Sequence, residues 1–283
     1  GEGNMRLKKT HIEKIGIKQG NTLGVLAGIH GNEICGVKAF DSMTSNLTIE
    51  SGKVYFIYAN LEAIKQNKRF IDYNLNRSFR RKIPKEALGS LEFETAKEII
   101  PYLKKADAML DIHASFTPNS SPFVICDKKW IKISNIFNAK IASFNWDKFE
   151  PGSTDYYMNK QRKPGFCYEC GFLKDPASTN KAKQAIKQFL IYYKCLSGKL
   201  TLISNQRIIK IIRLYKNKYG VFRKSKDFRD FEILEKDTII GKDGNKKIKV
   251  DKGKLIIFAR DIDNLGEECF LIAKESNNRS RLT

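Results

Sequence analysis

The first two-thirds of the chain alternates apolar runs with amphipathic segments. Continuous apolar runs predict buried strands at 22–30, 53–60, 107–113, 122–126 and 165–170. Apolar residues at helical spacing predict helices between these strands, at 33–44, 91–105, 129–139 and 176–195. Buried strands separated by helices are typical of a mostly parallel or mixed sheet with helices on both faces. The pattern therefore predicts an α/β domain over residues 5–198.

The pattern changes after about residue 200. Short β-branched runs such as RIIKIIRLY, KLIIFA and CFLIA follow one another, separated by the turn signals DGN, DKG and NLG. No long helical pattern occurs between residues 201 and 275. We expect residues 199–283 to form a smaller, β-rich C-terminal domain.

The composition narrows the class of protein. With 283 residues, 41% of them hydrophobic, the chain can bury a sizeable core. No apolar run approaches the roughly 18 residues that a membrane span requires, and scattered cysteines without a secretion signal indicate reduced thiols. We expect a cytoplasmic protein that does not cross a membrane. The net charge of +21 suits acidic partners, from nucleic acid to small acidic substrates, but the lysines are spread along the chain and form no single basic block.

Two of the three histidines stand at the ends of predicted strands. His30 ends the first strand and is followed by a turn and Glu33, while His113 closes the run AMLDIH. Open α/β sheets hold their ligands at this carboxyl edge. Two histidines and one carboxylate are the ligand count of a catalytic zinc, which keeps a fourth position for water. Taken alone, a histidine at a strand end is more often structural, so other segments must support a metal site.

Two further segments supply that support. The polar stretch RFIDYNLNR carries Arg69, Asn76 and Arg77, which can hold a carboxylate through a guanidinium fork and an amide. Glu169 lies inside the apolar strand GFCYECGF, where an acid is costly unless it lines a cavity or is paired. A carboxylate near a metal can accept a proton from water and donate it to a leaving amine. The sequence thus contains the parts of a hydrolytic metal site.

The order of these motifs resembles the succinylglutamate desuccinylase and aspartoacylase family, whose fold and mechanism are those of the zinc carboxypeptidases. The resemblance covers about residues 25–195 and rests on four motifs: HGNE at 30–33, NLNR at 74–77, DIH at 111–113 and ECG at 169–171. The β-rich segment that follows fits the extra C-terminal domain of that family.

The resemblance implies the catalytic roles. It makes His30, Glu33 and His113 the ligands of one zinc ion per chain. Arg69 would polarise the scissile carbonyl and stabilise the oxyanion, and Glu169 would act first as general base and then as general acid.

The same resemblance implies the residues around the ligands and the substrate. Asn76 and Arg77 would bind the carboxylate of the amino-acid part. Asn74 and Asp111 would contact the zinc ligands and orient them. The family usually has Asp in place of Asn74, and the sequence does not determine how this change affects the metal affinity. Aspartoacylases hold a second substrate carboxylate with an Arg and a Tyr before the catalytic Glu. Here the candidates are Tyr157 and the differently spaced Arg162, with Lys160 as an alternative to Arg162.

Together these observations predict a zinc-dependent amidohydrolase that removes the acyl group from a small acidic N-acyl amino acid. One alternative is a carboxypeptidase-like zinc peptidase, which also cleaves an amide beside a free carboxylate. Another is a basic nucleic-acid-binding protein with a degenerate metal site, which the charge favours and the complete set of site residues opposes. The sequence leaves open the acyl group, the amino acid and whether the chain forms a homo-oligomer.

Overall fold

The computed structural model describes residues 11–276, and its main feature is one large mixed sheet. The sheet has 11 strands in the order β1-β3-β2-β4-β7-β5-β6-β8-β14-β13-β10. Its centre consists of the parallel strands β3 (Ser51–Tyr58), β2 (Lys18–Ala27), β4 (Ala108–Ser115) and β7 (Gly165–Phe172). The predicted α/β fold with a mixed sheet is confirmed.

Strands of both directions flank this centre. On one side, β1 (His11–Ile15) runs antiparallel to β3. On the other, β5 (Phe123–Cys126) runs antiparallel to β7, and β6 (Ile141–Phe144) continues parallel to β5. The sequence pattern missed β1 and β6, whose short runs carry polar residues between the apolar ones.

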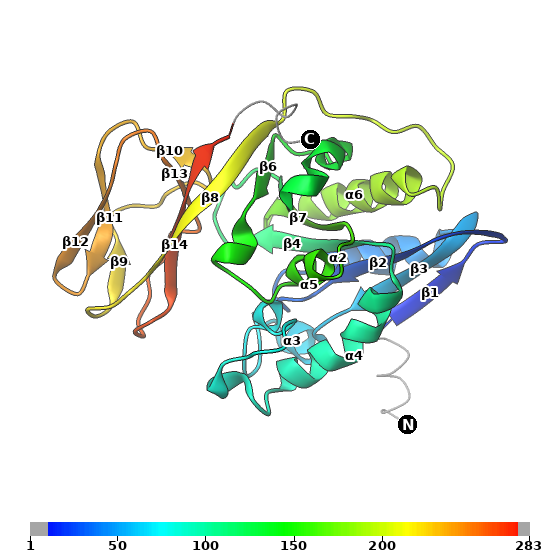
Figure 1. Ribbon diagram of the computed structural model, residues 1–283, viewed down its shortest axis with the longest axis horizontal. Coiled ribbons are helices and arrows are strands. Elements are labelled where there is room, and N and C mark those ends of the chain that lie inside the picture. Colours follow the sequence, from blue (N-terminus) through cyan, green and yellow to red (C-terminus); the bar gives the residue numbers. More distant parts are fainter. Residues whose placement is uncertain (1–10, 277–283) are drawn as a thin grey trace.

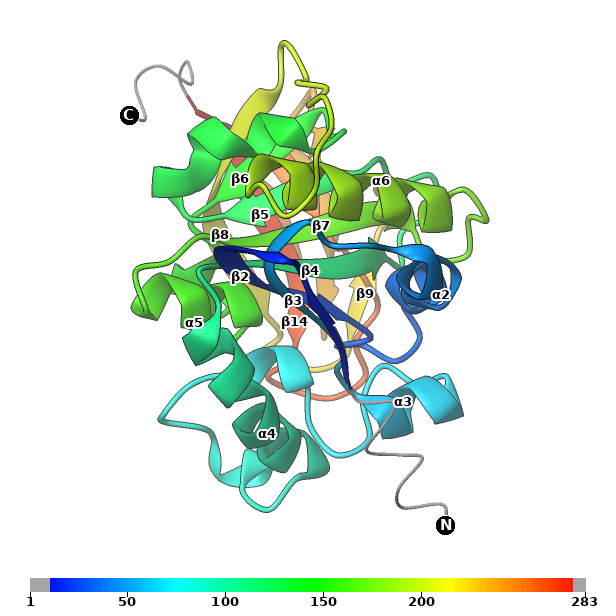
Figure 2. The ribbon, with the colours of Figure 1, turned by 90° about the vertical axis from the view of Figure 1, so that its right-hand side faces the viewer.

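Helices cover both faces of the central strands (Figures 1 and 2). The helices α2 (Cys35–Met43) and α6 (Ser178–Tyr192) contact each other and pack on one face, over a core that includes Phe40, Phe56 and Phe189. The helices α4 (Leu91–Lys105) and α5 (Thr154–Lys160) pack on the other face.

Three of the predicted helices are present, and the fourth differs. Residues 129–139 were expected to be α-helical, but Lys128–Ile136 forms the 3₁₀ helix η4. The β-branched isoleucines and Ser134 in this segment are weak helix formers, which is in keeping with the tighter and shorter turns. The short helix α3 (Leu61–Gln66), capped by the side chain of Asn60, was not predicted.

The C-terminal part is built from strands, as its sequence pattern predicts. Among the residues that the structure describes, no helix follows α6. The strands β8 (Arg207–Lys216), β14 (Glu268–Glu275), β13 (Leu255–Ile257) and β10 (Glu232–Ile233) extend the large sheet, because β8 pairs in parallel with β6. A separate antiparallel sheet contains β9 (Phe222–Lys224), β11 (Thr238–Asp243) and β12 (Lys246–Val250), at the left of Figure 1.

This continuity brings the C-terminal strands beside the α/β part. Cys269, Phe270 and Leu271 of β14 are buried, and Phe270 and Leu271 line the same cleft as the predicted zinc ligands. The independence of residues 199–283 as a folding unit stays a prediction. None of the described helices is both long and apolar enough to span a bilayer.

Candidate active site

The predicted site residues meet at the carboxyl ends of three adjacent strands. His30 and Glu33 lie in the turn that follows β2, His113 lies near the end of β4, and Glu169 lies near the end of β7. The pairing of β4 with β7 places His113 directly beside Glu169. The sheet edge that the sequence pattern indicates is therefore the place where these four side chains gather.

The turn after β2 depends on two glycines. Gly28 has φ +72°, a conformation that residues with a Cβ rarely adopt, and it ends the strand three residues earlier than the sequence pattern predicts. Gly31 packs against the backbone of Ala63 so closely that an added Cβ would lie 2.1 Å from its carbonyl carbon. The chain then closes with a hydrogen bond from the Glu33 N–H to the His30 carbonyl. This compact turn points both side chains inward.

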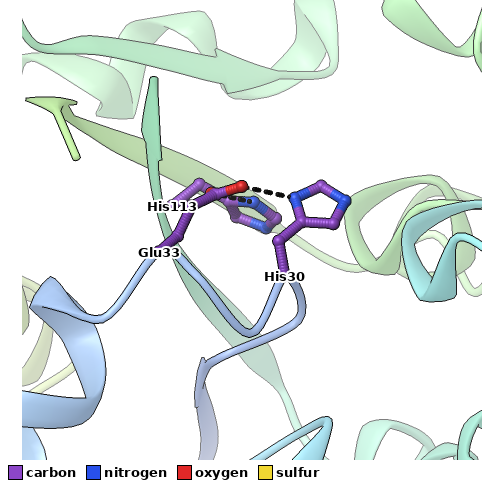
Figure 3. Close-up of side chains that lie close together, drawn as sticks. All are labelled: His30, Glu33 and His113. Carbon is purple, nitrogen blue, oxygen red and sulfur yellow. Dashed lines mark ion pairs between the residues drawn. The ribbon is translucent and has the colours of Figure 1, made fainter. Parts of the chain in front are cut away.

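The two histidines present equivalent atoms to the carboxylate between them. His30 Nδ1 lies 2.6 Å from Glu33 Oε2, and His113 Nδ1 lies 3.3 Å from Glu33 Oε1 (Figure 3). One ligand atom from each of the three residues fits within a span of 4.8 Å, and all three residues are buried. The geometry is that of a three-ligand metal site.

The outward ring nitrogens are held by other side chains. His113 Nε2 lies 2.9 Å from Asp111 Oδ2, and His30 Nε2 lies 2.9 Å from Asn74 Oδ1. Residues two apart on a strand face the same side, which explains the pairing of Asp111 with His113. Partners of this kind fix the tautomer and orientation of histidine ligands. Asp111 and Asn74 thus each contact one of the two histidines.

The hydrogen bonds at His30 indicate that a cation fits this site. Burial and the nearby Arg69 lower the pKa of His30 to about 4, so its ring is neutral and carries one proton. The Asn76 N–H donates to Asn74 Oδ1, which identifies that atom as an acceptor and assigns the ring proton to Nε2. The lone pair of Nδ1 then faces the Glu33 carboxylate, an arrangement that is repulsive without a positive charge between the two groups.

The charges around the other two candidate ligands shift their pKa values in opposite directions. Burial acts to raise the pKa of Glu33, but the neighbouring histidines hold it well below its ordinary value. Burial acts to lower the pKa of His113, but the carboxylates of Asp111 and Glu33 raise it well above its ordinary value. The carboxylates therefore favour positive charge at this point, and neutral imidazole with carboxylate is a donor set that suits zinc.

A second donor group shares one member with the first. His113, Cys167 and Glu169 also bring ligand atoms within 4.8 Å of one another. Burial and the Glu169 carboxylate raise the pKa of Cys167 well above its ordinary value, so its thiol stays protonated. Because cysteine binds metals as the thiolate, this group is the weaker candidate.

Glu169 lines the cleft without a strong partner. Its side chain is buried, and Oε2 accepts no hydrogen bond from the described residues. Burial, followed by the charge of Glu33, raises the pKa of Glu169 well above its ordinary value. A buried carboxyl group with a raised pKa in a cleft is typical of a general acid or base.

The polar loop that carries Arg69, Asn74, Asn76 and Arg77 also reaches the site. Arg69 Nη1 lies 3.6 Å from Glu33 Oε2, and about a third of its side chain is exposed. Burial, opposed by Glu33, lowers the pKa of Arg69 to about 10, so the guanidinium stays charged at neutral pH. Asn76 and Arg77 line the same cleft.

Arg77 is already paired with two carboxylates that the sequence did not single out. It forms ion pairs with Glu150 and with Glu268, the latter at 3.2 Å. Arg260 stands beside them, with Nη2 4.0 Å from Glu268 Oε2. Glu268 and Arg260 belong to the C-terminal strands and loops, where they are two charged residues among many, and no motif marks them.

The remaining lining and the size of the cleft limit what can enter. Phe116, Trp146 and Phe258 add aromatic walls, and the cavity volume is about 70 Å³. Sites for drug-sized ligands usually have volumes of about 300–1,000 Å³. The cleft therefore suits a small molecule, and the ion pairs of Arg77 fill part of the space.

The structure does not bring Tyr157 and Arg162 to this cleft. Ser153 and Asp155, at the start of α5, line it. Tyr157 lies two residues after Asp155 on the helix, about 200° around its axis, and lines a different surface pocket with Phe79 and Pro151. Arg162 follows the end of α5 in a left-handed turn with φ +59°, outside the lining of the cleft.

The chain is similar to known proteins in both sequence and fold. The family model described as "Succinylglutamate desuccinylase/Aspartoacylase catalytic domain" matches residues 19–193. The chain is 33% identical over 86 residues to a succinylglutamate desuccinylase from Pseudoalteromonas atlantica, a match that covers 29% of this chain and only 24% of that protein. It is 27% identical over 234 residues to a probable aspartoacylase from Trichodesmium erythraeum, which covers 72% of this chain and 77% of the relative.

Solved structures show the same fold at low sequence identity. A succinylglutamate desuccinylase from Vibrio cholerae superposes with a TM-score of 0.76 at 16% identity, covering 94% of this chain and 85% of the other. A succinylglutamate desuccinylase/aspartoacylase from Rhodobacter sphaeroides gives 0.71 at 15% identity, covering 95% and 89%. Both likenesses extend through the C-terminal strands. The family model covers well over half of the chain, and the chain therefore belongs to the succinylglutamate desuccinylase/aspartoacylase family.

Proposed function

We propose that the protein is a zinc-dependent amidohydrolase that removes the acyl group from an N-acyl amino acid. The observation that carries the proposal is the donor set of His30, Glu33 and His113, with the unpartnered carboxyl group of Glu169 beside it. The names of the relatives point to the same class of reaction. The small cleft favours a single N-acyl amino acid over a peptide, so the deacylase is preferred to the carboxypeptidase-like alternative.

Zinc bound by His30, Glu33 and His113 would polarise a substrate carbonyl and lower the pKa of water. The remaining chemistry belongs to the side chains around it. Glu169 accepts a proton from the attacking water and later donates it to the leaving nitrogen, and its Oε2 has no hydrogen-bond partner among the described residues that would compete for that proton. Arg69, charged and partly exposed beside Glu33, stabilises negative charge that develops on the carbonyl oxygen.

The test is the variant Glu169→Gln, measured with a panel of N-acyl amino acids. Gln is nearly isosteric, so the variant should keep its fold and bind about one zinc per chain. It should lose about 10²–10⁴-fold in kcat, the range typical of a general acid–base group. Its melting temperature should stay equal or rise slightly, since an unpartnered buried carboxyl group costs stability.

The same measurements can reject the proposal. A Glu169→Gln variant that turns over substrate at close to the wild-type rate would exclude the proton-transfer role. A wild-type protein that binds no zinc, or hydrolyses no member of the panel once loaded, would exclude the amidohydrolase. Gln in place of the exposed Glu98 on α4 is the matched control and should change neither activity nor zinc content.

A further inference from the structure

One group of four residues in the cleft contains two carboxylates and two guanidinium groups. Arg77 pairs with Glu150 and Glu268, and Arg260 lies against Glu268 through its side chain and donates from Nε to the Glu268 carbonyl. Arg77 and Glu150 are largely buried, with 13% and 10% of their side chains exposed. All four residues line the cleft that contains the predicted zinc ligands. These four residues together thus carry no net charge, although Arg77 was assigned to carboxylate binding.

One carboxylate of this group has an unused acceptor. Glu150 Oε1 is buried and accepts no hydrogen bond from any described residue, while Glu150 Oε2 pairs with Arg77. A buried carboxylate oxygen without a donor is costly, and such groups in native proteins are usually completed by a ligand or water. Because Glu150 lines the cleft, a small molecule bound there can supply the missing N–H.

The charges also restrict which amino acid can bind. If Arg77 receives the carboxylate of the substrate, Glu150 and Glu268 lose part of their pairing. An acidic side chain on the substrate would then place four carboxylates against the guanidinium groups of Arg77, Arg260 and Arg69, the last of which lines the same cleft, and an excess of negative charge is costly in a largely buried cleft. A substrate with one carboxylate and one cation keeps the charges around Arg77 balanced, since the cation pairs with the glutamates as they release Arg77.

We propose that this part of the cleft recognises a cationic side chain, so that the substrate is an N-acyl amino acid that ends in an ammonium or guanidinium group. The cation lies between Glu150 and Glu268, and the substrate carboxylate pairs with Arg77 or Arg260. The inference rests on the proposed amidohydrolase function and replaces the acidic substrate that the sequence predicts. Glu150 and Glu268 are then the residues that determine specificity.

The first experiment measures binding without turnover. Isothermal titration calorimetry compares lysine, norleucine and glutamate, which are product analogues with a cationic, a neutral and an anionic side chain. Wild-type protein should bind lysine at least tenfold more tightly than norleucine, and glutamate most weakly. The variant Glu150→Gln should reduce the preference for lysine over norleucine to less than threefold. Gln in place of the exposed Glu267 is the matched control and should leave the preference unchanged.

The second experiment measures kcat/KM for the Nα-acetyl derivatives of the same three amino acids. The cationic derivative should exceed the neutral one by at least tenfold, and Glu150→Gln should remove most of that difference. Should Glu150→Gln lower the melting temperature by several degrees, Glu268→Gln is used in its place, since either glutamate pairs with the cation.

The outcomes separate this inference from the proposed function. If the wild-type protein prefers the anionic compound, or binds lysine and norleucine equally, the inference is overturned. Hydrolysis of any of the derivatives would still support an amidohydrolase in that case. A lysine preference in calorimetry with no hydrolysis of any derivative would support the cation site and contradict the proposed function. If both glutamate variants keep the full preference for lysine, the glutamates that pair with Arg77 do not recognise the cation. This result would also overturn the inference.

Discussion

Glu92 on α4 holds the loop that carries four of the site residues, and replacing it tests how the site is positioned. Its carboxylate is fully buried and accepts four hydrogen bonds. One comes from the side-chain amide of Asn60 at 2.7 Å and one from the Ile71 N–H at 2.9 Å, both to Oε2. The N–H groups of Asp72 and Tyr73 donate to Oε1 at 2.9 and 3.1 Å. This residue therefore fixes the backbone between Arg69 and Asn74.

The variant Glu92→Gln removes half of these contacts without changing the volume of the side chain. A Gln keeps one acceptor oxygen, so two of the four donors lose their partner and face an N–H₂ group. Each buried donor left without an acceptor costs about 1–3 kcal/mol, so the free energy of unfolding should fall by about 3 kcal/mol. The loop should also move, and small displacements of positioned groups lower rates steeply. We expect kcat/KM to fall by at least about tenfold.

Urea denaturation and steady-state kinetics on the two proteins measure both effects. Glu94→Gln is the control, because Glu94 lies two residues further along α4 but is exposed and pairs only with Lys97 at the surface. It should cost less than about 0.5 kcal/mol, as exposed pairs usually do. If Glu92→Gln is as mild as Glu94→Gln in both assays, the reasoning that a buried carboxylate organises this loop is wrong.

Three further predictions follow from single side chains. His113→Ala should lose bound zinc and activity together, as elemental analysis and kinetics will measure, and full zinc content in this variant would contradict the ligand assignment. Asn74→Asp should bind zinc up to about tenfold more tightly in a competition assay with a chelator, since a carboxylate behind His30 strengthens its donor nitrogen; unchanged or weaker binding would count against that role. Burial acts to raise the pKa of Asp243, but hydrogen bonds from the Tyr215 hydroxyl and three backbone N–H groups hold it below its ordinary value of 3.8. Its stabilising effect is therefore fully present above that ordinary value and is lost as the pH falls from there through the lower pKa of the folded protein. Acid unfolding should therefore depend less steeply on pH below about 4 in Asp243→Asn than in the wild type, and identical profiles would contradict the shift.

The candidate metal ligands could be picked out from the sequence because each stands at a recognisable place. His30 and Glu33 share one turn, and His113 ends an apolar run that predicts a central strand. Glu169 was detectable because an acid in an apolar strand has no packing role. Glu150, Arg260 and Glu268 carry no such signal, since their proximity to Arg77 arises only when β14 joins the large sheet through β8.

The elements of the fold that could be predicted are those whose sequence pattern is also local. Long apolar strands such as Ala108–Ser115, which is buried along its whole length, have a pattern that does not depend on their neighbours. The four-residue strands β5 and β6 depend on pairing with other strands, and only the more apolar of the two, β5, was found. The 3₁₀ geometry of Lys128–Ile136 was not predicted, because apolar residues at helical spacing do not distinguish a 3₁₀ helix from an α-helix.

The charged residues near the two histidines differ from those near Arg77, and this difference affects how a substrate can lie in the cleft. His113 is backed by the charged Asp111, while His30 is backed by the neutral Asn74, so the metal end has one negative charge fewer than it would with Asp at 74. At the other end, Glu150 and Glu268 add two negative charges beside Arg77. Both features change the electrostatic potential along the cleft. The neutral Asn74 makes the potential more positive where an amide carbonyl would bind. Glu150 and Glu268 make it more negative where the substrate side chain would bind. A molecule with its amide carbonyl toward the histidines and a cation toward the two glutamates would be aligned by that gradient, and an acidic N-acyl amino acid would not.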